Sequence, residues 1–322
     1  MKIIAFFNNK GGVGKTTLVY HLAWMMSELR KTVVVVDLDP QANLSSMFLS
    51  NQTLANRIED KKSIMQALQP IISGTGDVQM PYIESMDQYL HLIIGDLSLA
   101  TYEDSLSESW AQTLTGSEKH FRNMSSFYRI IKMAAAEKEA DYVFVDIGPN
   151  LGAINRAALI SADTLIIPVA ADLFSIQGMT NLGNSLKKWR KDWKKRLNEN
   201  ENENLELPKG EMHTSGYILS QHGVRESRPV QAYLKWAKRI PIVYRKDILN
   251  QDIDENIEIK IEGDEYCLGL LKHYRSLMPM AIEVNKPIFM LKPADGAIGA
   301  HFNAIKDVYN DFKKIAERIM EL

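Results

Sequence analysis

The sequence predicts an α/β fold of the doubly wound type, in which a mainly parallel sheet carries helices on both faces. Short apolar runs bounded by turn residues alternate along the chain with longer amphipathic stretches. The short runs are rich in β-branched residues and almost continuously hydrophobic, as expected of strands that are covered on both faces. Six strands are therefore expected, at residues 3–7, 33–36, 90–94, 142–145, 165–169 and 216–219.

The amphipathic stretches between and after these runs are predicted helices, and they complete a single domain over residues 1–322. Three further segments are predicted to be insertions into that domain. Residues 51–88 combine a helix with a polar loop, residues 198–211 form an exposed flexible loop of Asn-Glu repeats, and residues 257–271 form a β-hairpin. The predicted helices lie at residues 15–29, 123–138, 176–196, 229–238 and 303–320.

The composition is that of a soluble globular protein, with 45% hydrophobic and 24% charged residues. No apolar run approaches the roughly 20 residues that cross a bilayer, and residues 1–7 are too short for a signal peptide, so we expect a cytoplasmic protein. The net charge of −2 means that any nucleic-acid site must be a local patch. Cys267 is the only cysteine, which argues against a cysteine-held metal cluster within one chain.

The strongest local signal is a glycine-rich loop between the first predicted strand and the first predicted helix. Its glycines let the backbone wrap around phosphate oxygens, and its N–H groups point inward at the start of the helix. Lys15 places a positive charge for the β- and γ-phosphates, Thr16 is expected to ligate Mg²⁺, and Thr17 to reach the α-phosphate. The predicted binding residues are Gly11, Gly12, Val13, Gly14, Lys15, Thr16 and Thr17.

A second lysine, Lys10, precedes the glycines, and Asn9 stands where the usual loop has glycine. With Lys10 and Lys15 the loop matches the signature Lys-Gly-Gly-x-x-Lys-Thr/Ser, and the sequence resembles the ParA/MinD family of deviant Walker A ATPases. The resemblance implies ATP and Mg²⁺ as cofactors and slow hydrolysis of ATP to ADP and phosphate. It also implies that Lys10 reaches the nucleotide of a partner protomer, so that a homodimer sandwiches ATP.

Two carboxylates, Asp37 and Asp39, follow the second predicted strand. Strand ends beside a phosphate loop lie at the edge of the sheet where ligands bind in this architecture. The stretch from Asp37 to Asn43 resembles the Asp-x-Asp-Pro-Gln-Gly-Asn segment of the ParA branch, with Ala42 in place of the glycine as a mild change. We expect Asp39 to orient and activate water and Asp37 to support the metal region.

A third carboxylate, Asp146, follows the four apolar residues 142–145, which is the Walker B pattern. By its order and spacing it is expected to hold a water molecule in the Mg²⁺ shell. Residues 147–152 keep one proline where the family has a pair, which leaves open how this loop moves with the γ-phosphate. The resemblance covers most of the chain outside residues 51–88 and 195–270, with further likenesses at residues 93–100, 168–172, 175–179, 277–281 and 286–288.

The helix expected at residues 176–196 carries a basic stretch that is the candidate DNA contact. Such a cluster gives salt-dependent, sequence-independent affinity. Trp189 and Trp193 share one helical face, so the alternative is a helix that packs its tryptophans on the core and merely solvates its lysines; both interpretations can hold together. The candidate DNA-binding residues are Lys187, Lys188, Arg190, Lys191, Lys194, Lys195 and Arg196.

The helix expected at residues 303–320 has an apolar stripe opposite a face of mixed charge. An anionic membrane prefers a uniformly basic face, so we expect this helix to pack against the sheet rather than to bind membrane.

The predicted function is an ATP-dependent, dimerising ATPase that partitions or positions DNA or another large cargo. Its expected partners are a second copy of itself, non-specific DNA and a ParB-like adaptor that stimulates hydrolysis, and DNA binding would place it on the nucleoid. The alternative is an ATP-gated regulatory or adaptor module that binds a protein partner with little turnover. A small-molecule ligase is a third possibility, which a substrate-dependent ATPase rate would reveal.

Overall fold

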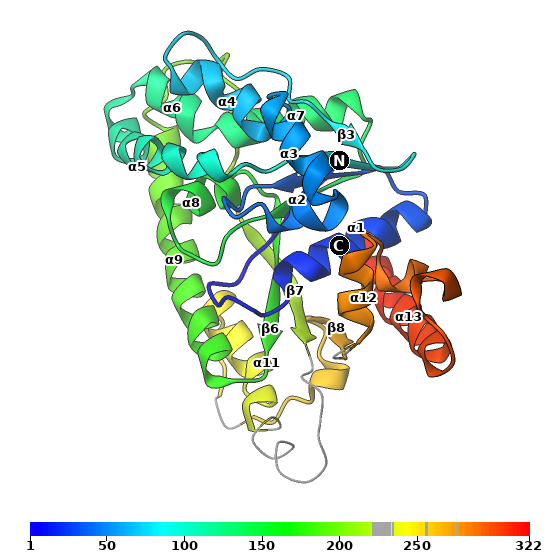
Figure 1. Ribbon diagram of the computed structural model, residues 1–322. Helices are drawn as coiled ribbons and strands as arrows, with labels where there is room; N and C mark the ends of the chain where they lie inside the picture. The colour runs from blue at the N-terminus through cyan, green and yellow to red at the C-terminus, as the bar shows by residue number, and fades with distance from the viewer. Residues whose placement is uncertain (221–232, 234, 255–256, 273, 275) are drawn as a thin grey trace.

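The computed structural model describes residues 1–220, 233, 235–254, 257–272, 274 and 276–322. Its strands form one sheet in the order β3-β4-β2-β5-β1-β6-β7-β8, in which every neighbouring pair is parallel except β3 and β4 (Figure 1). The predicted mainly parallel sheet is confirmed. The strands are β1 Lys2–Phe6, β2 Val33–Asp37, β3 Glu84–Ser85, β4 Leu90–Ile93, β5 Tyr142–Asp146, β6 Thr164–Ala170, β7 His213–Ser220 and β8 Cys267–Leu271.

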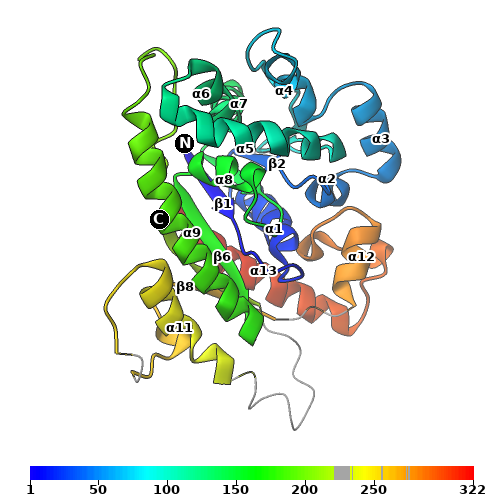
Figure 2. The same cartoon turned by 90° about the vertical axis from the view of Figure 1, so that its left-hand side faces the viewer.

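Helices cover both faces of this sheet, with α9 along one side and α12 and α13 on the other (Figures 1 and 2). Alternate residues of each strand point to opposite faces, so Ile3 and Ala5 join one buried cluster while Ile4 and Phe6 join the other. The helices are α1 Lys15–Glu28, α2 Asn43–Phe48, α3 Asn51–Glu59, α4 Ile64–Ile72, α5 Glu103–Gln112, α6 Glu118–Met124, α7 Ser126–Glu137, α8 Ala153–Ile160, α9 Leu173–Leu197, α11 Ile240–Val243, α12 Leu277–Glu283 and α13 Ala300–Met320.

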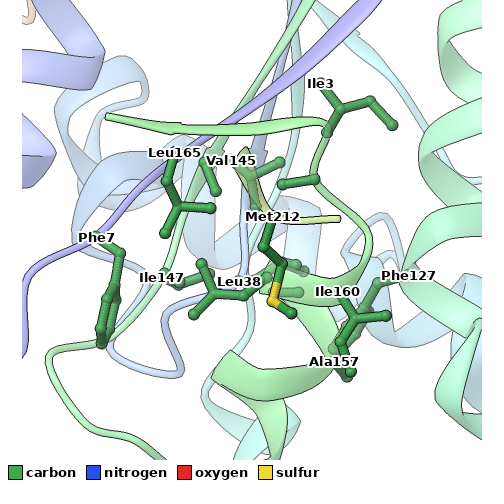
Figure 3. Packing of buried hydrophobic residues seen from close by; sticks show 14 of the residues in the cluster. Ile3, Phe7, Leu38, Phe127, Val145, Ile147, Ala157, Ile160, Leu165 and Met212 are labelled. Atoms are coloured by element: carbon green, nitrogen blue, oxygen red, sulfur yellow. The ribbon is translucent and has the colours of Figure 1, made fainter. Parts of the chain in front are cut away.

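The larger buried cluster lies between the sheet and the helices α4 to α9. Figure 3 shows strand residues such as Val145 and Leu165 facing Ala157 and Ile160 of α8, and Phe127 of α7. The smaller cluster joins the other face to α1, α2, α12 and α13. Because α1 and α8 begin just after the loops at the ends of β1 and β5, burial on both faces fixes those loops relative to each other.

The structure also corrects three expectations. The predicted helix at residues 123–138 is divided between the end of α6 and α7. The predicted hairpin at residues 257–271 is wrong: residues 261–263 form a short 3₁₀ turn, and β8 pairs in parallel with β7. The loop at residues 198–211 is anchored rather than freely exposed, because Leu205 is buried and the Pro208 carbonyl accepts a hydrogen bond from Trp193.

Other expectations have different outcomes. Residues 51–88 hold α3, α4 and β3. Half of the helix expected at residues 229–238, namely residues 229–232 and 234, lies outside the described residues. The closing helix α13 packs against the sheet as expected, since Val308, Phe312 and Ile319 are buried. Within the part of the chain that the structure describes, no helix is long and apolar enough to cross a membrane.

Candidate functional site

The glycine-rich loop, residues 9–14, links β1 to α1 at the carboxyl edge of the sheet. Gly12 and Gly14 have φ angles of 75° and 79°, which strain residues with a side chain. Gly14 is the N-cap of α1, and no side chain in the described structure caps this helix. The first N–H groups of a helix have no partner within it, so this end suits an anion such as phosphate.

Lys15, Thr16 and Asp146 meet beneath this loop. The Lys15 ammonium donates to Asp146 Oδ1 at 2.5 Å, and the Thr16 hydroxyl donates to Asp146 Oδ2 at 2.9 Å. The side chain of Lys15 is 8% exposed and that of Asp146 is fully buried. Burial raises the pKa of Asp146, while the charge of Lys15 opposes that rise. The fold thus places a cation, a hydroxyl and a carboxylate in contact in a site with little water.

Asp37 lies next to Asp146, because the two residues are paired across β2 and β5. Its Oδ2 accepts hydrogen bonds from Ser45 N at 2.8 Å and Ser45 Oγ at 2.7 Å, and its Oδ1 accepts one from Asp39 N at 3.2 Å. Burial, and then the charge of Asp146, raises the pKa of Asp37 to about 7. With these oxygens engaged by its own chain, Asp37 occupies a supporting position, and direct metal ligation by Asp37 stays a prediction.

Asp39 is 6% exposed, and its Oδ1 accepts a hydrogen bond from Gln41 N at 3.0 Å. The same oxygen faces Gly148, since a Cβ built on that glycine would lie 3.4 Å away from it. Ala42 has a φ of 50°, in the left-handed region that costs a residue with a Cβ about 1–2 kcal/mol. The exchange of glycine for Ala42 is therefore a strained one, rather than the mild change expected from the sequence.

The residues present fit Mg²⁺ bound together with a nucleotide. In the described structure no three His, Cys, Asp or Glu side chains converge as a metal site. Mg²⁺ is usually held by one or two carboxylates together with substrate phosphates and water. The Thr16 hydroxyl and the Asp146 carboxylate offer such a partial set of oxygen ligands, which phosphate oxygens would complete.

Lys10 lies on the outer side of the loop, where its ammonium pairs with Asp172 of the same chain. Asp172 is the N-cap of α9, and its Oδ1 accepts a hydrogen bond from Ser175 N at 2.9 Å. Asn9 packs against the same helix, because a Cβ at Gly178 would lie 2.4 Å from Asn9 Oδ1. Asp172 was not among the predicted site residues. The spacing of Asp172 and Ser175 is typical of a helix N-cap, and this was the signal in the sequence that could have drawn attention to Asp172.

The basic half of α9 has a buried face and an exposed face. Trp189 and Trp193 are buried, which confirms that the tryptophans pack on the core. Trp193 stacks on Trp110 of α5, with ring centroids 6.0 Å apart. The exposed cations are Lys187, Lys188, Lys191, Lys194 and Lys195.

The two arginines of this stretch are engaged within the chain. Arg196 is 6% exposed, and its guanidinium donates to the carbonyls of Trp110 and Asp192, both at 2.9 Å. This burial removes the charge of Arg196 from the surface and argues against the predicted contact of Arg196 with DNA. Arg190 is half-buried and donates to the carbonyls of Glu211 and Met212.

A glycine-rich loop follows a parallel strand, and its lysine and threonine contact a carboxylate at the end of another strand. This arrangement defines a P-loop nucleotide-binding protein. A family model described as an AAA domain matches residues 1–199. The chain therefore belongs to this family, and its relatives are ParA/MinD-like ATPases. It is 29% identical over 186 residues to the sporulation initiation inhibitor protein Soj of Bacillus subtilis (strain 168). That match covers 58% of this chain and 65% of Soj, so it spans less than two thirds of that relative.

Two solved structures share the fold over nearly the whole chain. A putative plasmid partition protein of Borrelia burgdorferi B31, bound to AMPPNP, has a TM-score of 0.58 and 19% identity, and the alignment covers 99% of this chain and 98% of that one. A complex of Cyanothece McdA with ATP has a TM-score of 0.60 and 16% identity, with 99% and 96% coverage. At these identities the likeness shows the fold alone.

Proposed function

We propose that this protein binds MgATP, dimerises with ATP between two protomers, and hydrolyses it slowly to partition or position DNA or another large cargo. The observation that carries the proposal is the contact of Lys15 and Thr16 with the buried Asp146 at the uncapped start of α1. The chromosome partitioning protein ParA of Caulobacter vibrioides, to which this chain is 23% identical over 197 residues, supports a role in partition.

In this proposal the phosphate loop binds by its backbone N–H groups and by Lys15, which exchanges its bond to Asp146 for phosphate oxygens. Such an exchange costs little, because charge-assisted hydrogen bonds replace one another. Bound Mg²⁺ would neutralise phosphate charge, held by Thr16 and Asp146. Asp39 would accept a hydrogen bond from the attacking water and orient it toward the γ-phosphorus, giving ADP and phosphate.

Lys10 is the residue that we expect to act on the nucleotide of a second protomer. Its ammonium is held beside the loop by a partly exposed ion pair with Asp172, and exposed pairs of this kind contribute little stability. Next to it, Leu173 and Phe174 expose 40% and 67% of their surface. An apolar patch beside a partly exposed cation is consistent with a face that a second copy covers when ATP is bound.

The exposed lysines of α9 are the proposed DNA contact. Lys188, Lys191 and Lys195 follow one another at helical spacing on the outward face, so they can neutralise neighbouring phosphates along one strand. An open hollow of about 670 Å³ next to them is lined in part by Arg190, Lys194, Lys209 and His213. A partner that stimulates hydrolysis, of the ParB type, belongs to the same proposal.

The test is binding of random-sequence duplex DNA with MgATP, MgADP or no nucleotide, across a salt series. ATP-dependent binding that weakens with salt is expected, and it should be lost in Lys10→Ala and in Lys188→Glu/Lys191→Glu. The matched control is Lys119→Glu/Lys314→Glu, which makes the same change in net charge at exposed lysines elsewhere. No binding under any nucleotide would sink the DNA role and leave the ATPase proposal standing.

The alternative of an ATP-gated adaptor module predicts a different result. Such a protein would bind MgATP tightly but show negligible hydrolysis, even with DNA and candidate partners present. Measuring hydrolysis and affinity on the same preparation separates the two proposals.

A further inference from the structure

Glu103 caps a helix to which it does not belong. It is the first residue of α5, and its carboxylate accepts hydrogen bonds from the N–H groups of Ala153 and Ile154, the latter at 2.9 Å. These are the first two residues of α8. A carboxylate at a helix N-terminus satisfies unpaired donors and interacts favourably with the helix dipole. Glu103 therefore fixes the start of α8 from outside.

The segment that α8 follows is the loop of residues 147–152, which connects it to Asp146 at the end of β5. Asn155 ties this loop together, since its amide donates to the carbonyls of Gly148 at 2.7 Å and Asn150 at 2.6 Å. Gly148 in turn faces the carboxylate of Asp39. One end of the loop thus carries Asp146, its middle lies against Asp39, and its far end is held by Glu103.

The junction is built around Glu103 and leaves no room for a larger residue at position 152. A Cβ on Gly152 would lie 2.5 Å from Glu103 Oε1. The φ of Gly152 is −75°, which residues with a side chain adopt readily, so the close approach of Glu103 and of Asn150 Oδ1, and not backbone strain, explains this glycine.

The other contacts between α8 and α5 are less directional than the hydrogen bonds of Glu103. Trp110 of α5 contacts two guanidinium groups, with Arg156 of α8 at 4.4 Å and Arg196 of α9 at 4.1 Å from its ring. Arg156 Nε is buried without a hydrogen-bond partner in the described structure. Stacking of this kind tolerates sliding, whereas two charge-assisted hydrogen bonds define a direction. Among the contacts between α5 and α8, the two hydrogen bonds of Glu103 are therefore the ones that fix where α8 begins.

We propose that Glu103 is a positioning residue for ATP hydrolysis, because by capping α8 it holds the 147–152 loop in register with Asp146 and Asp39. The inference rests on the function proposed above and adds to it a residue 43 positions before Asp146 in the sequence. Loss of the cap frees the loop without touching the phosphate loop, so hydrolysis should fall while nucleotide affinity is kept. A displacement of about 1 Å at a catalytic group can cost on the order of 100-fold in rate.

The experiment uses the full chain and compares Glu103→Ala and Glu103→Gln with the wild type. Asp104→Ala is the matched control, since Asp104 is the next residue of α5 and is exposed. Three quantities are measured: single-turnover hydrolysis of MgATP with and without duplex DNA, the Kd of a fluorescent ATP analogue, and amide hydrogen exchange of residues 147–154. Glu103→Ala should hydrolyse ATP at least about 10-fold more slowly, with a Kd within about 3-fold of wild type. Its Ala153 and Ile154 amides should exchange faster.

Glu103→Gln keeps one carbonyl acceptor and nearly the same volume, so it should give an intermediate rate, and it carries the test if Glu103→Ala does not fold. Faster exchange with an unchanged hydrolysis rate would overturn the inference. So would a loss of affinity in parallel with the loss of rate, which indicates a general structural role. A wild-type protein that binds MgATP but does not hydrolyse it would refute the proposed activity itself, and this inference with it.

Discussion

The lysines of the phosphate loop and the lysines of α9 lie in opposite electrostatic settings. Lys15 is buried against Asp146, and Lys10 pairs with Asp172. The α9 lysines at positions 187, 188, 191, 194 and 195 are exposed, and none forms an ion pair with another described residue. Charges interact strongly where water is excluded and weakly where salt screens them. Single substitutions should therefore have large effects at the first site, and small, additive, salt-dependent effects at the second.

Lys15→Ala is the substitution for which this comparison predicts the largest effect. It removes the cation for the phosphates and leaves Asp146 buried without a partner. Loss of charge-assisted hydrogen bonds of about 1.5–3 kcal/mol each should weaken MgATP binding at least about 100-fold. Isothermal titration calorimetry measures this directly. Lys188→Ala is the control and should leave the affinity unchanged; an affinity of Lys15→Ala within 3-fold of wild type would contradict the assignment of the site.

Asp39→Asn tests the same site without changing its shape. Asparagine can still accept the hydrogen bond from Gln41 N, but it is a poor acceptor for the proton of water. Hydrolysis should fall on the order of 100-fold, as expected for loss of a general base, while MgATP affinity changes little. Single-turnover hydrolysis and a parallel binding titration decide the outcome. A rate close to that of wild type would transfer the role of orienting water to another group.

The region around the phosphate loop also contains a buried histidine, His21 in α1. Its protonation makes the stability of this region depend on pH in a way that the α9 lysines do not. His21 Nε2 accepts a hydrogen bond from Ile288 N at 3.1 Å, so Nδ1 carries the proton and donates to the Thr17 carbonyl at 2.8 Å. The ring also stacks on Phe312, with centroids 4.9 Å apart. Burial lowers the pKa of His21 from 6.5 to about 4.

This shift makes the folded protein less stable in acid. The unfolded chain takes up the proton near pH 6.5 but the folded chain only near pH 4, so the contribution of His21 is complete above pH 6.5 and is lost as the pH falls toward 4. The contribution of Asp37 to stability changes with pH in the opposite direction. Its pKa is raised to about 7 in the folded protein, so Asp37 contributes stability at low pH, and this contribution is lost as the pH rises through 7.

The two contributions are separated by comparing variants, since Asp37 is common to both proteins. Urea unfolding of wild type and His21→Gln is measured at pH 7.5 and pH 5. Wild type should lose about 2 kcal/mol more than the variant over this interval, the value that linkage gives for the stated shift. Equal losses in the two proteins would show that His21 takes up its proton in the folded state as readily as in the unfolded chain.

The sequence was sufficient for the parts of the molecule whose signals are local. The predicted strands are buried on both faces and read as short apolar runs, and the glycine-rich loop lies between two of the predicted elements. The alternation of Ile257, Ile259 and Ile261 with charged residues suggested a hairpin, but such a pattern does not reveal which strand is the partner. β8 pairs instead with β7, far away in the sequence.

The residues that sequence reasoning missed act over long separations. Glu103 caps α8 about 50 residues later, and Asp172 pairs with Lys10 from the other half of the family domain. The residues near Glu103 and Asp172 in the sequence do not indicate which distant residues these two contact. Arg196 is different, because Trp189, Trp193 and Arg196 have the spacing of one helical face, and this periodicity indicated that Arg196 shares the buried side of the tryptophans.

Because Arg196 is buried and Lys191 is exposed, these two residues allow a test within one helix. Lys191→Gln should lower the affinity for duplex DNA only a few-fold and should reduce the slope of log K against log salt by about 1, as expected for one lost phosphate contact. Arg196→Gln should leave that slope unchanged and instead destabilise the fold by about 1–3 kcal/mol, because its hydrogen bonds to the carbonyls of Trp110 and Asp192 are lost. Salt titration of DNA binding gives the slope for each variant, and urea unfolding gives the stability of each. If Arg196→Gln lowers the salt slope as Lys191→Gln does, the buried guanidinium reaches the surface when DNA binds, and the division of α9 into a structural and a binding face is wrong.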